Sequence, residues 1–127
     1  MKEIIATDKA PQAIGPYSQA VKLMAGETLF CSGQVPIDPA SGQIVAGLPE
    51  VQTEQVMKNL RSVIEAGGFT MEDIVKTTIY LTDITFFTSV NKVYESYFHG
   101  TFPARSTVQV SALPRGVSVE IEAIACK

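Results

Sequence analysis

The chain has 127 residues, of which 46% are hydrophobic and 18% charged, so it should fold as one domain, residues 1–127, and is not intrinsically disordered. A net charge of −3, with lysines and arginines scattered singly, argues against binding to nucleic acid or to a membrane surface. No apolar run reaches the roughly 20 residues of a bilayer span, and the amino terminus lacks a secretion signal.

Residues that commonly hold a metal or cofactor are few. Cys31, Cys126 and His99 are far apart in sequence, which makes a zinc or haem site improbable. Neither the phosphate-binding loop G-x-x-x-x-G-K-[ST] nor the dinucleotide motif G-x-G-x-x-G occurs. We therefore expect chemistry without a metal or cofactor, in a cytoplasmic protein with reduced cysteines.

The first half of the chain predicts three strands and one helix. The strands are expected over residues 3–6, 17–23 and 28–35, the last two joined by a hairpin at 25–27. The helix is expected over residues 51–66 from an apolar stripe, with Pro49 in its first turn and Gly67-Gly68 at its end. Residues 70–73 then form a capping box.

The second half predicts a strand, a helix and two more strands. Alternation predicts a strand over residues 74–82, and a helix follows from Asp83 or Thr85 to about Phe98. The last strands are expected over residues 105–112 and 117–126. The order is β-β-β-α-β-α-β-β.

This order favours an α+β fold in which two amphipathic helices cover one face of a mixed sheet of five or six strands. The other sheet face has no predicted cover. On the last strand that face carries Ser118, Glu120, Glu122, Ile124 and Cys126, so it is half apolar and half charged. A second subunit often covers such a face. The alternative is a monomer whose open sheet face is solvated.

Two kinds of charged residue stand out as candidates for chemistry. Arg105 begins a predicted strand, and a guanidinium group can bind a carboxylate through two parallel hydrogen bonds. The plainer interpretation is a surface ion pair. Glu120 and Glu122 share one strand face, about 7 Å apart. Each is either a structural ion-pair partner or, if it meets water, a general base.

Two hydroxyl-bearing segments are weaker candidates. Tyr17-Ser18 follows Gly-Pro, and Ser32 precedes Gly33, so both place hydroxyls beside exposed backbone suited to binding an anion or a carbonyl. The alternatives are a turn for the first and a strand bulge for the second. Cys31 is expected in the core rather than as a nucleophile. His99 is expected at a helix carboxyl end, as a partner of the helix dipole.

Five segments together resemble a known family. They are A-I-G-P-Y-S-Q-A (13–20), F-C-S-G-Q-V-P (30–36), D-I-V-K-T-T-I-Y-L (73–81), F-P-A-R-S (102–106) and V-E-I-E-A-I-A (119–125). In this order and spacing they resemble the RidA/YjgF family of reactive-intermediate deaminases, over nearly the whole chain. The pair P-A-R-S and V-E-I is the most specific part of the match.

The resemblance implies a chorismate-mutase-like fold with a mixed sheet and two helices on one face. It also implies a homotrimer whose sheets face inward, with a ligand cleft at each subunit boundary. The implied activity is hydrolysis of 2-imino acids such as 2-iminobutanoate and 2-iminopropanoate, or their enamine tautomers, to 2-oxo acids and ammonia. The imines come from pyridoxal-phosphate-dependent dehydratases that act on threonine or serine.

The resemblance also implies roles for individual residues. Arg105 matches the arginine that binds the substrate carboxylate, and Glu120 the glutamate that activates the attacking water. Tyr17 borders the cleft, and Ser32 with Gly33 lines it. Asn91, on the second helix, matches a position that is often polar near the pocket.

One position departs from the family pattern. Many members carry Cys two residues after the arginine, where this chain has Thr107. A protonated imine is already electrophilic, so water and a base suffice and a thiol nucleophile is not required. Residue 107 can contribute its backbone N–H with either side chain.

A geometric argument also favours a cleft shared between chains. If residues 113–116 make a tight hairpin, Arg105 lies opposite residue 125 or so, several residues away from Glu120. One chain then does not bring both side chains to a single ligand unless a bulge intervenes.

Three further functions stay open at this level. A metabolite-binding or regulatory module would use Arg105 to hold a 2-oxo acid without turnover. RNA cleavage or translation inhibition has been attached to relatives, but the acidic balance and single histidine argue against it. A purely structural, chaperone-like trimer would need an exposed apolar patch.

Overall fold

A computed structural model describes residues 2–24 and 26–127. The strands and α-helices are β1 (Lys2–Ile5), β2 (Ala20–Leu23), β3 (Thr28–Gln34), α1 (Pro49–Ala66), β4 (Ile74–Leu81), α2 (Phe87–Glu95), β5 (Ala104–Gln109) and β6 (Val119–Cys126). The predicted order β-β-β-α-β-α-β-β is therefore confirmed. Short 3₁₀ turns precede β4, α2 and β6.

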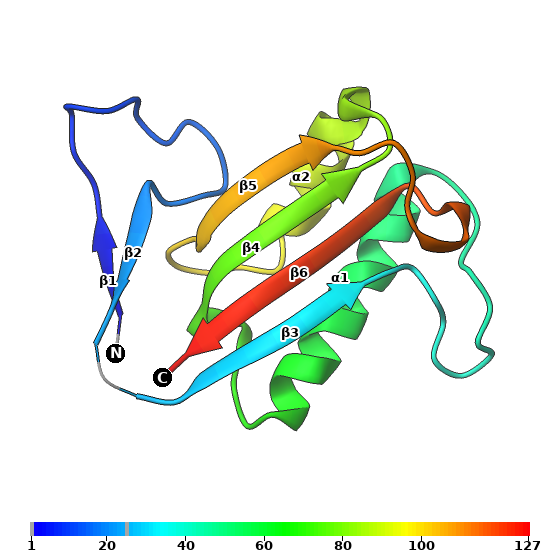
Figure 1. Ribbon diagram of the computed structural model, residues 1–127, viewed down its shortest axis with the longest axis horizontal. Helices are drawn as coiled ribbons and strands as arrows, with labels where there is room; N and C mark the ends of the chain where they lie inside the picture. Colours follow the sequence, from blue (N-terminus) through cyan, green and yellow to red (C-terminus); the bar gives the residue numbers. More distant parts are fainter. Residues whose placement is uncertain (1, 25) are drawn as a thin grey trace.

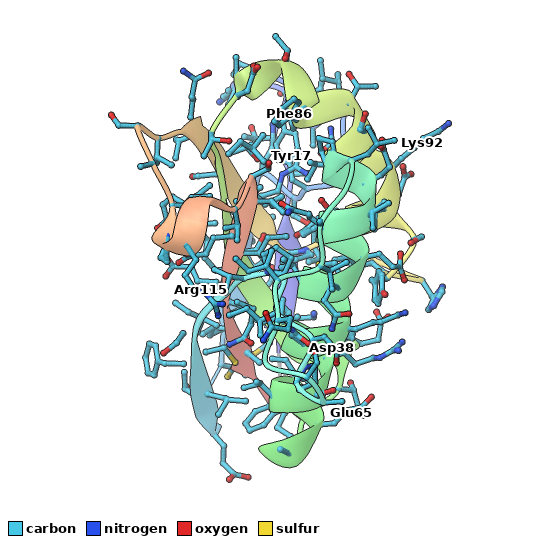
Figure 2. All side chains as sticks on the ribbon, turned by 90° about the vertical axis from the view of Figure 1, so that its right-hand side faces the viewer. Tyr17, Asp38, Glu65, Phe86, Lys92 and Arg115 are labelled. Atoms are coloured by element: carbon cyan, nitrogen blue, oxygen red, sulfur yellow. The ribbon has the colours of Figure 1, made fainter. Side chains whose placement is uncertain are left out.

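A four-stranded mixed sheet forms the centre of the fold, in the order β3-β6-β4-β5. Strand β6 runs antiparallel to both β3 and β4, whereas β5 is parallel to β4. Helices α1 and α2 lie together behind this sheet in Figure 1, and the view turned by 90° in Figure 2 shows them on one side of it. The α+β architecture with both helices on one face is confirmed.

Two predicted strand pairings are wrong. Strand β2 pairs with β1 rather than β3, so the first two strands form a separate two-stranded sheet beside the main one, and no five- or six-stranded sheet forms among the described residues (Figure 1). Part of the hairpin predicted at residues 25–27 lies outside the described residues. The tight hairpin at 113–116 is also absent, because the 3₁₀ turn Pro114–Gly116 carries the chain past β4.

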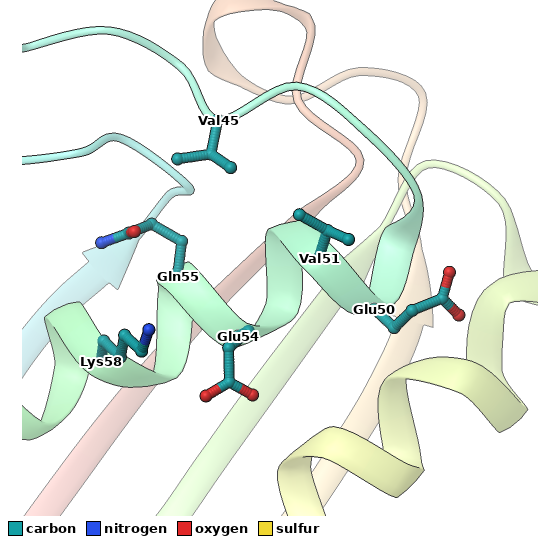
Figure 3. A pocket seen from close by; sticks show the side chains of 6 residues that line it. All are labelled: Val45, Glu50, Val51, Glu54, Gln55 and Lys58. Carbon is teal, nitrogen blue, oxygen red and sulfur yellow. The ribbon is translucent and has the colours of Figure 1, made fainter.

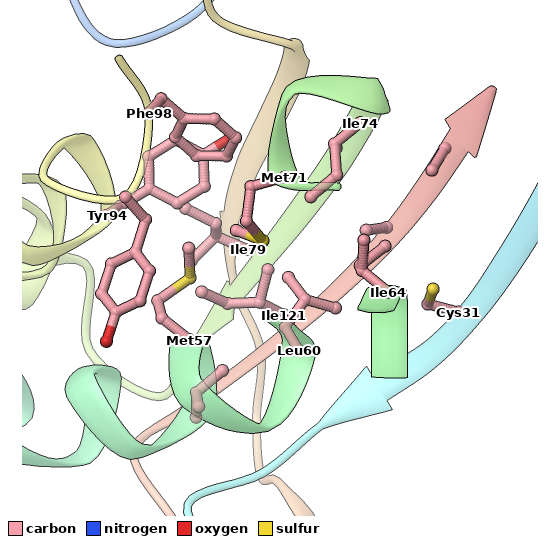
Figure 4. Close-up of a cluster of buried hydrophobic side chains, with 14 of the residues drawn as sticks. Cys31, Met57, Leu60, Ile64, Met71, Ile74, Ile79, Tyr94, Phe98 and Ile121 are labelled. Carbon is pink, nitrogen blue, oxygen red and sulfur yellow. The ribbon is translucent and has the colours of Figure 1, made fainter. Parts of the chain in front are cut away.

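The core lies between the sheet and the two helices. From α1, Met57, Leu60 and Ile64 face Ile79 of β4 and Ile121 of β6, and all five are fully buried (Figure 4). The alternation on β6 is confirmed on this face, where Val119, Ile121, Ala123 and Ala125 are buried. Cys31 also lies in the core as predicted, and burial raises the pKa of its thiol.

The helix boundaries are set by local residues. Pro49 occupies the first turn of α1, as predicted, and the capping box holds, since the Asp73 carboxylate accepts from the Thr70 backbone N–H at 2.8 Å. Helix α2 is shorter than predicted at both ends, since the Asp83 cap begins a 3₁₀ turn and the helix ends at Glu95. His99 consequently lies four residues beyond the end of α2 and is not a dipole partner. Neither α1 nor α2, the α-helices of the described residues, is long and apolar enough to span a bilayer.

A buried hydrogen bond joins the sheet to α2 directly below the candidate site. The hydroxyls of Thr77 on β4 and Tyr94 on α2 are 2.8 Å apart, and both residues are fully buried. Burial raises the pKa of Tyr94 to about 12, so its hydroxyl stays protonated at neutral pH.

We expect Tyr94→Phe to lower the free energy of unfolding by about 1–3 kcal/mol, because it leaves the Thr77 hydroxyl buried without a partner. The double variant Thr77→Val/Tyr94→Phe removes both hydroxyls at nearly constant shape and should recover most of that loss. Urea unfolding at one protein concentration measures both. A single variant as stable as the starting protein would contradict the prediction.

Candidate active site

Arg105 lies on β5, the edge strand, and points to the helix-covered side of the sheet. It is in register with Thr77 of β4, and its guanidinium reaches across to α2, where Nη1 donates to Oδ1 of Asn91 at 2.7 Å. The structure therefore joins two predicted site residues by a direct contact. Asn91 acts here as the group that fixes the direction of the arginine.

Three aromatic rings surround the half-buried Arg105 guanidinium. Its central carbon lies 5.7 Å from the ring centre of Tyr17, 5.4 Å from that of Phe87 and 5.2 Å from that of Tyr94. Burial lowers the pKa of Arg105, while the Tyr94 and Tyr17 hydroxyls act in the opposite direction. The rings hold the cation by cation–π attraction and limit its motion. An arginine has five N–H donors, and among the described residues only Asn91 accepts from this one, so donors remain for a ligand.

Tyr17 is brought to Arg105 by the attachment of its loop to β5. The Ser18 backbone N–H donates to the Pro103 carbonyl at 3.0 Å, and the Ser18 hydroxyl donates to the Phe102 carbonyl. A parallel bridge also links Ser18 to Ala104. The Gly-Pro-Tyr-Ser segment is therefore a fixed wall of the site, held at the point where β5 begins.

Thr107 lies two residues after Arg105, on the same face of β5. Its Oγ1 atom is buried and makes no hydrogen bond with the described residues. A buried hydroxyl without a partner is costly, and such groups often mark a place where a ligand or water binds. The Thr107 hydroxyl therefore keeps an unused hydrogen-bonding capacity two residues from Arg105.

A hollow of about 380 Å³ opens beside this cluster. It is lined by Ile14, Gly15, Pro16, Thr88, Asn91, Lys92, Glu95 and Phe102. Ile14 is 93% exposed at its rim. Asn91 thus links the hollow to the arginine.

Glu120 lies on the opposite face of the sheet, on β6, against the backbone of Gly33. A β-carbon at position 33 would overlap the carboxylate of Glu120, so the Glu120 side chain can occupy this position only because residue 33 is glycine. The register of β3 shifts between Cys31 and Gln34, so the strand bulge named as the alternative for this segment is present, and Ser32 within it is exposed. Burial raises the pKa of Glu120, and the charge of Glu122 adds to the effect.

Within one chain the two principal candidates are separated. Arg105 is in register with Thr77 and thus with Ala123 of β6, whereas Glu120 is three residues further along and on the other face. Two strand spacings across and three residues along give about 14 Å between their α-carbons. Arg105 and Glu120 of one chain are therefore apart, as predicted, although the hairpin used in that prediction is absent. Tyr17, Asn91, Arg105 and Thr107 lie on one face of the sheet, and Gly33 and Glu120 lie on the other.

The sequence did not predict the roles of Phe87 and Tyr94 beside Arg105. A signal was present: Phe87, Asn91 and Tyr94 recur at i, i+4 and i+7, so a polar residue interrupts an apolar helix face. A second hollow, of about 390 Å³, lies over the start of α1 (Figure 3). None of the predicted site residues lines it, so we assign no function to it.

Comparison with known proteins identifies the family to which this chain belongs. A family model described as Endoribonuclease L-PSP matches residues 7–127. The 2-iminobutanoate/2-iminopropanoate deaminase of Mus musculus is 50% identical over 125 residues, which cover 98% of this chain and 91% of that protein. A RutC family protein of Pyrococcus horikoshii is 51% identical over 127 residues, covering 100% of this chain and 99% of the relative.

The crystal structure of E. coli TdcF with bound serine is 42% identical, with a TM-score of 0.77 and 98% of each chain covered. These matches, like the fold, define a small α+β protein with a mixed sheet and two helices on one face. The chain belongs to the Endoribonuclease L-PSP family, which is the RidA/YjgF family indicated by its sequence motifs.

Proposed function

We propose that this chain hydrolyses reactive 2-imino acids, such as 2-iminobutanoate and 2-iminopropanoate, to 2-oxo acids and ammonia. The observation that carries the proposal is the fixed Arg105 guanidinium, which keeps free donors beside a buried Thr107 hydroxyl that has no partner among the described residues. A fork of this kind matches a carboxylate. The deaminase name of the mouse relative and the serine bound to TdcF, itself an amino acid with a carboxylate, support the same substrate class.

The site is shared between chains in this proposal. Arg105 and Glu120 lie on opposite sheet faces of one chain, so a small substrate touches both only if a second copy supplies one of them. The sheet face away from the helices offers apolar surface for such a copy, since Phe30 is 75% exposed and Val108 42% exposed. A closed ring of three copies with these faces inward would create three equivalent clefts.

The chemistry follows from the two groups. Arg105 of one copy binds the substrate carboxylate and aligns the C=N bond, while Glu120 of a neighbouring copy accepts a proton from water. The water oxygen bonds to the imine carbon, and the C=N π electrons move to nitrogen. Protonated Glu120 then gives its proton to the nitrogen of the carbinolamine formed from the protonated imine, and the C–N bond breaks as ammonia leaves. The hydroxyl proton passes to the Glu120 carboxylate as the carbonyl forms. No step requires a metal or cofactor.

The direction of the pKa change at Glu120 suits this role. A carboxylate with a raised pKa is a stronger base once it has lost its proton. The rate should therefore rise with pH as Glu120 loses its proton and level off above that pH.

A coupled assay tests the proposal. A threonine dehydratase generates 2-iminobutanoate in the presence of semicarbazide, which traps the imine, and this chain competes for the imine by hydrolysing it. We expect trapping to fall and free 2-oxobutanoate to form faster when the chain is added. If trapping is unchanged while the chain still binds 2-oxobutanoate, it is a metabolite-binding module and not a deaminase.

The same preparation also tests the nuclease activity that the family description names. His99, the single histidine, is exposed and shares a hollow of about 280 Å³ with Glu54, Lys58 and Arg61 rather than with Arg105. The net charge of −3 gives this surface little attraction for RNA. We expect no RNA cleavage by the purified protein.

A further inference from the structure

A second carboxylate, Glu122, lies on the same face of β6 as Glu120 and has a partner of its own. The hydroxyl of Tyr80 on β4 donates to Oε1 of Glu122. In the sheet register, however, Tyr80 lies opposite Glu120, and Thr78 lies opposite Glu122. The tyrosine side chain therefore leans diagonally across the strands, away from Glu120 and toward Glu122.

This arrangement leaves the two carboxylates in different situations. The side chain of Glu122 is held in a fixed position by the hydrogen bond that it accepts from the Tyr80 phenol. Glu120 rests against the Gly33 backbone, and among the described residues no donor reaches its carboxylate. Residues two apart on a strand are separated by about 7 Å, so the fixed charge of Glu122 acts directly on Glu120.

The other groups on this face do not compensate that charge. On β4, Tyr80 is neutral at ordinary pH, and Lys76 lies beyond Glu122, in register with Ile124. Lys76 forms no ion pair with the described residues. The facing segment of β3, Ser32 to Gln34, has no titratable side chain. In the proposed assembly, Arg105 of a neighbouring copy is the cation that approaches Glu120.

We propose that Glu122, held by Tyr80, is a positioning residue that tunes Glu120 as the base by holding a fixed negative charge beside it. The inference rests on the proposed function for its consequence in catalysis. The charge of Glu122 raises the pKa of Glu120, and the bond to Glu122 raises the pKa of Tyr80, in agreement with the geometry. The three residues then act differently, since Glu120 takes the proton, Glu122 sets the pH at which it can do so, and Tyr80 holds Glu122 in place.

The test titrates Glu120 directly. Carbon-13 labelling of the glutamate carboxyl groups allows NMR to follow Glu120 in the assembled protein as pH changes. We expect Glu122→Gln to lower the Glu120 midpoint by about half a pH unit or more. Tyr80→Phe keeps both carboxylates but frees Glu122 to turn toward solvent, and should lower the midpoint in the same direction by less. The matched control Glu65→Gln, on the exposed side of α1, also removes one negative charge and should leave the midpoint unchanged.

The pH profile of imine hydrolysis gives the catalytic consequence. In Glu122→Gln the acid limb of kcat/KM should move to lower pH by the same amount as the NMR midpoint. A uniform loss of activity at every pH, with the midpoint unmoved, shows a merely structural role for Glu122 and overturns the inference. If Glu122→Gln does not fold, an unmoved midpoint in Tyr80→Phe overturns it instead.

The two measurements also separate this inference from the proposed function. A shifted midpoint in a protein without deaminase activity keeps the coupling between the carboxylates and removes the proposed reaction. An unmoved midpoint in an active enzyme keeps the proposed reaction and removes the coupling between the carboxylates.

Discussion

Replacing Arg105 by alanine is expected to lower kcat/KM for 2-iminobutanoate by about 10²- to 10³-fold, equivalent to roughly 3–4 kcal/mol of transition-state stabilisation. The guanidinium is held by Asn91 and by three aromatic rings before any ligand arrives, so little ordering is needed when a carboxylate binds. Alanine removes both parallel hydrogen bonds and the positive charge. The semicarbazide competition assay measures the change in rate, and calorimetry with 2-oxobutanoate measures the loss of binding.

Two controls make the Arg105 result specific. Arg105→Lys keeps the charge but not the planar fork, so its activity should lie between those of the starting protein and Arg105→Ala. Arg61→Ala removes another arginine that rests on an aromatic ring, that of Tyr97 at 5.3 Å, outside the candidate site, and should leave the rate unchanged. Undiminished binding of 2-oxobutanoate by Arg105→Ala would show that the carboxylate anchor lies elsewhere.

The fold shows which features of a sequence can be interpreted directly. Alternation along residues 117–126 predicted which side chains of β6 are buried, because burial on one sheet face imposes a period of two. Which strands pair with each other in the sheet leaves no such pattern in the sequence. The short link at 113–116 resembled a hairpin, yet Arg115, with φ 58°, and Gly116, with φ 72°, turn the chain so that β6 enters between β3 and β4.

The candidate site likewise has residues that the local sequence predicted and contacts that it did not predict. Arg105 and Glu120 were predicted through short motifs, F-P-A-R-S and V-E-I, which lie on single strands. The rings of Phe87 and Tyr94 come from another element, and their contact with Arg105 depends on how α2 packs over β5. The placement of Arg105 and Glu120 on opposite faces depends on the register of β5 and of β6 with β4. Such relations arise from the whole sheet and have no local signature.

Glu120→Gln is expected to lower kcat by about 10²- to 10⁴-fold, because the amide cannot accept the proton that water loses. Glutamine has nearly the same shape, so the contact with Gly33 and the binding of 2-oxobutanoate should survive. Glu65→Gln serves as the charge-matched control and should keep full activity. Unchanged hydrolysis by Glu120→Gln, measured across the pH range, would show that another group is the base.

Mixing the two inactive variants decides whether the site is shared. If Arg105 and Glu120 of one site belong to different chains, unfolding and reassembling Arg105→Ala with Glu120→Gln in equal amounts makes some sites that contain both native residues. With random assembly, each of the two positions in a site carries its native residue with a probability of about one half. About one quarter of the sites therefore carry both native residues and regain activity. If both residues of a site came from the same chain, every site would carry one defect and the mixture would stay inactive. Recovery therefore requires that the opposite sheet faces of two copies meet around one substrate.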